Sequence, residues 1–263
     1  MQGQPPRRLA LLLEYEGTAY GGSQYQKNAR TIQDSLERAL SSLTSEPIRV
    51  ALAGRTDAGV HAKGQVASFV TGSRHAVSTF VQALNALLPG DIAVRAAAEV
   101  PLAFDPRRYA RSRWYRYTLH LGPTRPALLR NFVWHIGRPL DLDAMSRAAA
   151  ALAGEHDFAA FTRPSEAARR PARRTVTVAR LSRRRDLVLF DIEANAFLMQ
   201  MVRRITAALV AVGTGKLSPE QLEALVREAR PGAAAHTAPP GGLCLIKVRY
   251  ESGLFDDEKN ENL

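Results

Sequence analysis

The stretch Ala53-Gly54-Arg55-Thr56-Asp57-Ala58-Gly59-Val60-His61 places two glycines, an arginine, a carboxylate and a histidine within a short span. Strand-like apolar runs lie before it, at Ile48–Leu52, and after it, at Gln65–Val70. Glycine permits backbone angles that other residues resist, so we expect a tight loop between two strands. Because side chains alternate along an extended segment, Arg55 can lie beside Asp57 and keep its carboxylate ionised and oriented. A hairpin turn with a surface ion pair explains the spacing equally well.

The elements predicted around this loop alternate between strands and helices. In the first half, the hydrophobic pattern predicts strands at about 8–16, 48–53, 64–70 and 91–100, and helices at 31–43 and 79–88. Thr31 and Ser78 are the expected helix caps. The resulting order, β-α-β-β-α-β, is the ferredoxin-like or split β-α-β pattern.

The second half repeats this order without matching residues. It has predicted strands at about 114–121, 174–182, 187–194 and 243–250, with an extended piece at 132–136, helices at 142–153 and 197–212, and a smaller helix opened by Ser218-Pro219. The sequence therefore predicts an α+β fold of two ferredoxin-like halves with mainly antiparallel sheets. The expected limits are 1–106, 107–250 and a disordered acidic tail at 251–263.

Composition points to a polyanionic partner. The net charge is +11 and the pI is near 10.4, with most of the charge in residues 111–263. RNA, DNA and an anionic membrane surface all fit this balance. A single cysteine, Cys244, excludes an internal disulfide and a cysteine-based zinc site. Neither a signal peptide nor a membrane-spanning run is predicted, so we expect a cytoplasmic protein.

The central stretch resembles the signature of the TruA-type tRNA pseudouridine synthases, A-G-R-T-D-A-G-V-H-A-x-G-Q-V. The chain matches it from Ala53 to Ala62 and again from Gly64 to Val66. Residues 14–26 resemble the family's Y-D-G-T-x-Y-x-G-W-Q-x-Q loop, but Ser23 replaces the usual tryptophan. Residues 197–203 resemble its F-x-x-x-M-V-R helix, and residues 238–243 its A-P-P-x-G-L segment. The resemblance implies two ferredoxin-like halves with a central cleft.

The resemblance also assigns catalytic residues. It makes Asp57 the nucleophile, with Arg55 and Arg203 holding the carboxylate ionised and aimed. Tyr115, in Arg113-Trp114-Tyr115-Arg116-Tyr117, is implied to contact the target base, since aromatic side chains among arginines suit stacking on unpaired bases. The alternatives are core aromatics beside solvated arginines, and an Arg203 on the wet side of its helix.

Further side chains are expected to bind substrate. Gln65, Arg113 and Leu243 are expected substrate-binding residues. In the basic loop 163–174, four arginines could bind RNA phosphates through counterion release: Arg169, Arg170, Arg173 and Arg174. A solvated charge run is an equally good interpretation of this loop. No metal-ligand spacing is present.

The implied activity is isomerisation of uridine to pseudouridine at tRNA positions 38, 39 and 40, in the anticodon stem-loop. The nucleotide must be flipped out before Asp57 can reach it. Whether Asp57 attacks ribose or base, or enables a glycal route, stays open. No cofactor is expected, because the reaction is neither a redox step nor a group transfer, and the resemblance implies a homodimer whose tRNA contacts both subunits.

Two other functional classes remain open at this point. A non-catalytic RNA-binding protein would explain the charge and the aromatics, and it would form no pseudouridine. A uracil-releasing hydrolase would use Asp57 to activate water and would liberate free uracil.

Overall fold

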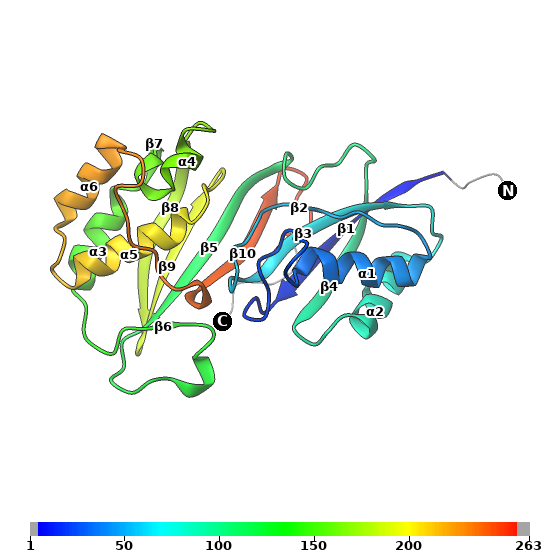
Figure 1. The fold of residues 1–263 in the computed structure, drawn as a ribbon, viewed down its shortest axis with the longest axis horizontal. Helices are drawn as coiled ribbons and strands as arrows, with labels where there is room; N and C mark the ends of the chain where they lie inside the picture. Colours follow the sequence, from blue (N-terminus) through cyan, green and yellow to red (C-terminus); the bar gives the residue numbers. More distant parts are fainter. Residues whose placement is uncertain (1–4, 257–263) are drawn as a thin grey trace. The chain divides into compact units, whose positions relative to one another are not determined.

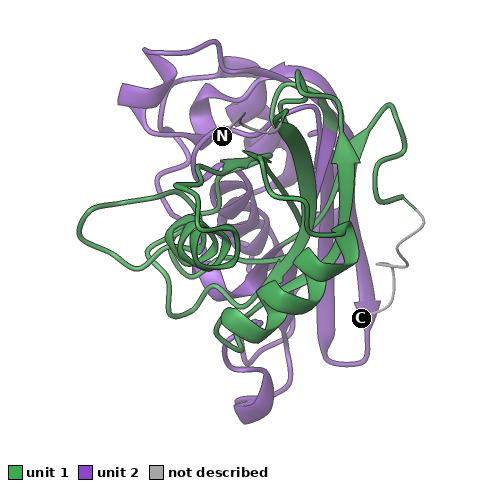
Figure 2. Ribbon diagram, turned by 90° about the vertical axis from the view of Figure 1, so that its right-hand side faces the viewer, with its two compact units in different colours: residues 1–111, 245–263 green, residues 112–244 purple. Residues whose placement is uncertain are grey.

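The strands and helices form two compact units. The computed structural model describes residues 5–256. Unit 1 comprises residues 1–111 together with 245–263, as far as these are described, and unit 2 comprises residues 112–244 (Figure 2). Most of the last strand, residues 245–250, is therefore grouped with the first unit, although it follows the second in the chain.

Unit 1 is built on strands in the order β4-β1-β3-β10, with β2 paired to β3. The pairings of β1 with β3, of β1 with β4 and of β2 with β3 are antiparallel. Their bounds are β1 Arg7–Tyr15, β2 Ala51–Leu52, β3 His61–Thr71, β4 Ile92–Val100 and β10 Leu243–Tyr250. Because β3 lies between β1 and β2, the first half has the split β-α-β arrangement. Consecutive residues Leu9–Leu13 of β1 are all buried, which indicates a strand covered on both faces.

Two helices of unit 1, α1 (Ile32–Thr44) and α2 (Val77–Leu87), lie beside each other along these strands (Figure 1). The predicted cap of α1 is confirmed, since Thr31 Oγ1 accepts the Asp34 N–H at 3.2 Å. The predicted cap of α2 is wrong. The helix begins at Val77 after Ala76, whose carbonyl accepts the Thr79 N–H, so Ser78 lies inside the first turn.

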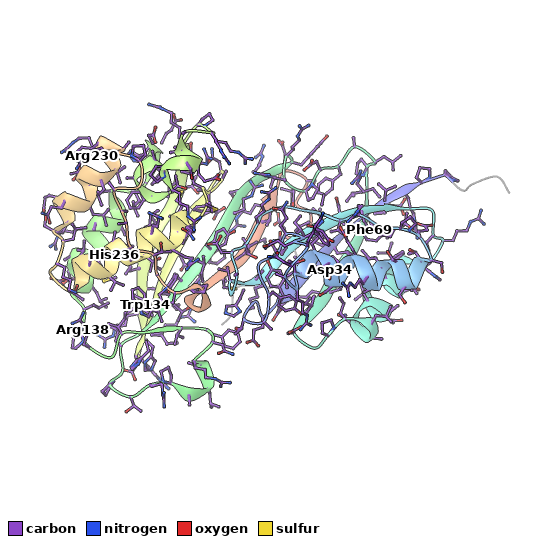
Figure 3. All side chains as sticks on the ribbon, viewed as in Figure 1. Asp34, Phe69, Trp134, Arg138, Arg230 and His236 are labelled. Carbon is purple, nitrogen blue, oxygen red and sulfur yellow. The ribbon has the colours of Figure 1, made fainter. Side chains whose placement is uncertain are left out.

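The strand predicted at 48–53 is shorter in the structure and spans Ala51–Leu52, because side chains of α1 bind the backbone before it. Ser41 Oγ accepts the Ile48 N–H at 3.2 Å, and Glu37 Oε1 accepts the Val50 N–H at 3.0 Å. These donors therefore bond to a helix and not to a neighbouring strand. Figure 3 labels Asp34 on α1 and Phe69 on β3. The centroid of the Phe69 ring lies 5.7 Å from that of Phe80 in the core of unit 1.

Unit 2 carries antiparallel strands in the order β5-β9-β8-β7, with β6 parallel to β5. Their bounds are β5 Ala110–His120, β6 Trp134–His135, β7 Gly154–Asp157, β8 Arg173–Arg184 and β9 Leu187–Ala194. The helices are α3 Leu142–Ala150, α4 Pro164–Ala167, α5 Met201–Gly213 and α6 Pro219–Glu228, with single 3-10 turns η1 Ala127–Leu129, η2 Ala159–Phe161 and η3 Pro240–Gly242. Helices α3, α5 and α6 contact one another, and α3 also packs on β8.

The α+β class with mainly antiparallel strands is confirmed. The description as two ferredoxin-like halves, with limits at 1–106 and 107–250, stays a prediction. Of the tail expected to be disordered, residues 257–263 lie outside the described part. Residues 251–256 form turns, and Asp256 pairs with Lys247 Nζ at 3.0 Å.

A buried carboxylate links β5 to β9. Asp191 accepts hydrogen bonds from Trp114 Nε1 at 2.8 Å and from Arg116 Nε at 2.9 Å. The Arg116 guanidinium also lies over the Trp114 ring, 5.3 Å from its centroid. Trp114 and Arg116 thus form a polar cluster within unit 2, on the face of β5 opposite Tyr115.

Asp191→Ala should therefore lower the free energy of unfolding by about 3 kcal/mol, because it leaves the Arg116 guanidinium, whose side chain is only 13% exposed, without its partner. Urea unfolding of purified protein measures this loss. The control is Glu155→Ala, which removes the exposed ion pair with Arg173 and should cost less than about 0.5 kcal/mol. Equal losses in the two variants would contradict this interpretation of Asp191.

Candidate active site

The loop of residues 53–61 joins β2 to β3 and carries Asp57; we call it the Asp57 loop. Asp57 is half-buried, whereas Arg55 is exposed. The Val60 N–H donates to the Asp57 carbonyl at 3.1 Å, which closes the end of the loop. Gly59 has φ +78°, a left-handed conformation that favours glycine, which explains why a glycine stands at this position.

Gln65 of β3 binds the beginning of this loop. Its side chain is buried, its Nε2 donates to the Gly54 carbonyl at 2.9 Å, and its Oε1 accepts the Gly54 N–H at 3.3 Å. Nε2 also lies 3.4 Å from the Tyr15 hydroxyl. This amide therefore acts on the chain's own backbone, and contact of Gln65 with substrate stays a prediction.

A second loop, residues 17–24, packs closely against the Asp57 loop. A Cβ on Gly17 would lie 2.0 Å from the Val60 carbonyl oxygen, and one on Gly22 would lie 2.9 Å from the Thr56 carbonyl oxygen. Gly22 has φ +106°, which disfavours other residues for a second reason. Glycine is needed at both positions because two backbone segments approach each other here.

His61 belongs to this packing. It is buried, and its Nδ1 accepts the Gly17 N–H at 3.0 Å. A ring nitrogen that accepts a hydrogen bond carries no proton, so Nδ1 cannot serve as a proton donor. The geometry gives His61 a structural role at the junction of the two loops.

Tyr115 and Tyr117 lie on one face of β5, as the alternation predicts. The Tyr115 ring is buried and meets Phe197 edge to face at 5.1 Å. The Tyr117 hydroxyl donates to the Pro239 carbonyl at 2.7 Å, and burial raises the pKa of Tyr117, so this phenol stays protonated. A Cβ on Gly242 would lie 2.5 Å from the Tyr117 ring, so Tyr117 packs directly against η3.

Arg203 lies in the first turn of α5, which begins at Met201 and not at the predicted 197. Gln200 has φ 61°, a left-handed conformation that ends any continuous helix from Phe197. The half-buried Arg203 donates through Nε to the Ala238 carbonyl at 2.8 Å, and its carbonyl accepts the Ala238 N–H at 3.1 Å. Arg203 is thereby fixed to the segment that precedes η3.

The neighbouring candidates in unit 2 are largely buried. Arg113 donates through Nη1 to the Asn195 carbonyl at 2.7 Å, and Leu243 is buried directly after η3. Arg204 donates through Nη1 to the Ala234 carbonyl at 2.7 Å. Burial and the nearby Arg163 and Arg203 charges lower the pKa of Arg204. The guanidinium groups of Arg163, Arg203 and Arg204 therefore lie near one another at the first turn of α5.

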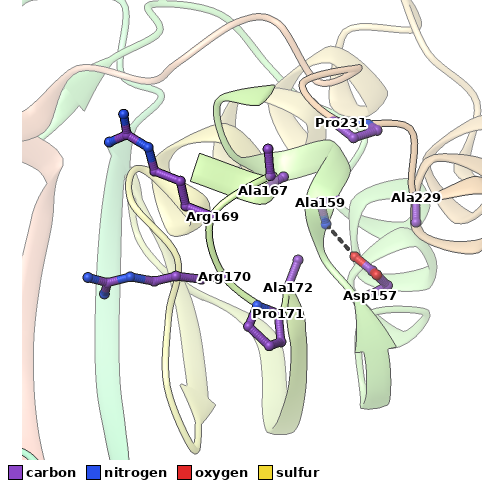
Figure 4. A pocket seen from close by; sticks show the side chains of 10 residues that line it. Asp157, Ala159, Ala167, Arg169, Arg170, Pro171, Ala172, Ala229 and Pro231 are labelled. Carbon is purple, nitrogen blue, oxygen red and sulfur yellow. Dashed lines mark hydrogen bonds between the residues drawn. The ribbon is translucent and has the colours of Figure 1, made fainter. Parts of the chain in front are cut away.

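The four arginines of the 163–174 loop separate into two pairs. Arg173 forms an ion pair with Glu155 at 2.9 Å, and Arg174 Nη1 donates to the carbonyls of Pro171 and Arg173. Burial lowers the pKa of Arg174. Arg169 and Arg170 are exposed, and their side chains extend outward from the rim of a pocket of about 480 Å³ (Figure 4). Arg173, although ion-paired, is exposed as well, and phosphate binding by any of the four stays a prediction.

Metal-binding clusters and membrane-spanning helices are absent from the part of the chain that the structure describes. Between residues 5 and 256, no group of three His, Cys, Asp or Glu side chains is arranged to hold a metal ion. Within the same range, no helix is long and apolar enough to cross a membrane.

Comparison with known proteins adds an independent observation. The family model described as tRNA pseudouridine synthase matches residues 12–109 and 148–251. Proteins called tRNA pseudouridine synthase A from Geotalea uraniireducens, Geobacter sulfurreducens and Acetivibrio thermocellus are 43%, 46% and 41% identical to this chain. Each alignment covers 93% of this chain and 100% of the relative.

A solved archaeal box H/ACA sRNP Nop10-Cbf5 complex is similar at a TM-score of 0.37 and 12% identity. The match covers 78% of this chain and 44% of that one.

Proposed function

The chain belongs to the tRNA pseudouridine synthase family, and on this basis we propose that it converts uridine to pseudouridine at tRNA positions 38, 39 and 40, with Asp57 as nucleophile. The enzyme is an isomerase. The observation that carries the assignment of Asp57 is its loop, where a half-buried carboxylate lies on a backbone held at Gly54, Thr56 and Val60.

The reaction exchanges one bond of the uracil for another. The bond between N1 and the ribose C1′ breaks, the base rotates, and C5 bonds to C1′. C5 then loses its proton, while N1 gains one. Attack of Asp57 on C1′, its attack on the base ring, and a glycal route all require an ionised carboxylate beside the flipped nucleotide. Arg55 and Arg203 are proposed to stabilise and aim that charge.

Tyr115 is proposed to stack on the uracil and to accept the C5 proton. Its edge-to-face contact with Phe197 fixes the ring plane, which a stacking platform requires. Arg113 and Leu243 are proposed to border the substrate, and Gln65 is assigned to the base of the Asp57 loop.

The tRNA partner follows from the family and agrees with the net charge of +11. We assign phosphate binding to Arg169 and Arg170, because Arg173 and Arg174 are already bonded within unit 2. A homodimer in the cytoplasm, with tRNA contacting both subunits, is proposed from the family resemblance.

Asp57→Asn should abolish turnover while tRNA affinity and the melting temperature stay close to wild type. Loss of a covalent catalyst costs several kcal/mol of barrier, so we expect less than about a thousandth of the wild-type rate. Single-turnover pseudouridine formation measures it. Asp34→Asn, in the first turn of α1, is the matched control and should keep the rate within about two-fold. A substantially active Asp57→Asn would remove the nucleophile role.

Tyr115→Phe separates stacking from proton transfer. The ring remains, so stacking worth about 1–3 kcal/mol should survive, and tRNA affinity should be near normal. The hydroxyl is removed, so the rate should fall about 10²–10⁴-fold, as for removal of a general base. Tyr115→Leu should lower both affinity and rate. A fully active leucine variant would place Tyr115 outside the site.

Arg169→Ala combined with Arg170→Ala should weaken tRNA binding. The slope of log affinity against log salt should flatten by roughly one unit for each phosphate that is no longer bound. The control pair, Arg173→Ala with Arg174→Ala, removes arginines bonded within the protein and should leave the slope unchanged. The assignment fails if the outer pair leaves the slope intact, or if the control pair changes it as much.

A further inference from the structure

Ser23 and Thr56 form a two-way hydrogen-bonded bridge next to Asp57. The Ser23 N–H donates to the Thr56 carbonyl at 3.1 Å, and Ser23 Oγ accepts the Thr56 N–H at 2.8 Å. Ser23 is fully buried, with 0% exposure, and Thr56 is buried as well. These two backbone groups of Thr56 belong to the two peptide planes that precede the Asp57 side chain. The bridge therefore fixes the direction in which the chain enters Asp57.

Ser23 is itself anchored to α1. Its carbonyl accepts the Gln33 N–H at 3.0 Å, and the Gly22 carbonyl accepts the Ile32 N–H at 3.4 Å. These donors belong to the first turn of the helix, where N–H groups have no partner within the helix. A helix of 13 residues with a buried apolar stripe is thus connected to Thr56 through Ser23.

The Thr56 side chain is held separately. Its Oγ1 lies 2.9 Å from the hydroxyl of Tyr15, a buried residue at the end of β1. Thr56 therefore has its N–H, its carbonyl and its hydroxyl all bonded, and Asp57 beside it is half-buried. Such a fixed neighbour is what an aimed nucleophile requires, because small displacements of a reacting group cost large factors in rate.

The identity of residue 23 matters for the bridge. The bond needs a side-chain acceptor at residue 23, which a serine hydroxyl supplies and an indole N–H, a donor only, does not. A tryptophan could not accept the Thr56 N–H, so this hydrogen bond depends on the serine at position 23.

We propose that Ser23 is a positioning residue for the isomerisation: by binding the Thr56 backbone through its N–H and Oγ, it aims the Asp57 carboxylate at the flipped nucleotide. This inference rests on the proposed role of Asp57. It assigns Ser23 to the chemical step and not to tRNA binding, since the side chain is fully buried within unit 1.

Ser23→Ala tests the proposal by removing Oγ while leaving the backbone bond. The single-turnover rate of pseudouridine formation at saturating enzyme should fall about 10–100-fold, as expected for a misplaced reacting group. The Kd for tRNA should stay within about two-fold. A rate within two-fold of wild type, or an effect seen entirely in Kd, would overturn the proposal.

Ser41→Ala is the matched control. Ser41 Oγ also accepts a backbone N–H of a buried residue, Ile48, at 3.2 Å within unit 1. It should lower the melting temperature as Ser23→Ala does and keep the rate within two-fold. An equal fall in rate in both variants would mean that general destabilisation, not positioning, slows the reaction.

Conservative replacements keep the test decisive if Ser23→Ala does not fold. Ser23→Thr retains a hydroxyl acceptor, and Ser23→Cys offers only a weak one. The rate should follow the acceptor, falling from serine through threonine to cysteine. A cysteine variant at the wild-type rate would overturn the proposal. An active Asp57→Asn would instead overturn the nucleophile, so the two failures are distinguishable.

Discussion

The proposed chemistry depends on one constraint, which is that the backbone around Asp57 must not relax. Gln65 binds Gly54 through both ends of its amide, Ser23 binds Thr56 through two hydrogen bonds, and the Val60 N–H closes onto the Asp57 carbonyl. If water satisfied the polar groups of this loop, its backbone would stay mobile and the Asp57 carboxylate would have no fixed orientation. The buried hydrogen bonds hold the backbone at Asp57 in one conformation. Glycine at positions 17 and 22 allows the second loop to pack against the backbone of Val60 and Thr56.

In unit 2, side chains that look alike in the sequence have different physical roles. Tyr117 is a buried donor packed against η3, whereas Tyr115 has its ring plane set by Phe197. Arg116 neutralises Asp191 in the interior, while Arg169 and Arg170 extend into solvent. Charge and aromatic content alone therefore do not separate buried, internally bonded side chains from exposed ones. Burial and existing bonds make that distinction, and the proposed RNA-binding residues are chosen by it.

Elements with long apolar runs could be predicted from the sequence, such as Arg7–Tyr15 and Leu243–Tyr250. The strand Gly154–Asp157 has no apolar run that would predict it. The hydrophobic pattern predicts too early a start for α5, because it continues through Gln200, whose backbone is left-handed. The Asp57 loop was identifiable by its motif. Its support was not, because the bond between Ser23 and Thr56 joins residues 33 positions apart, and no local pattern predicts that contact.

The most direct measurement is incubation of purified protein with an unmodified tRNA transcript, followed by mapping of pseudouridine and assay for free uracil. We expect pseudouridine at positions 38, 39 and 40 wherever uridine occurs there, with no uracil released and no cofactor added. Release of free uracil would make the protein a hydrolase. Binding of the transcript without any pseudouridine would contradict the catalytic role of Asp57.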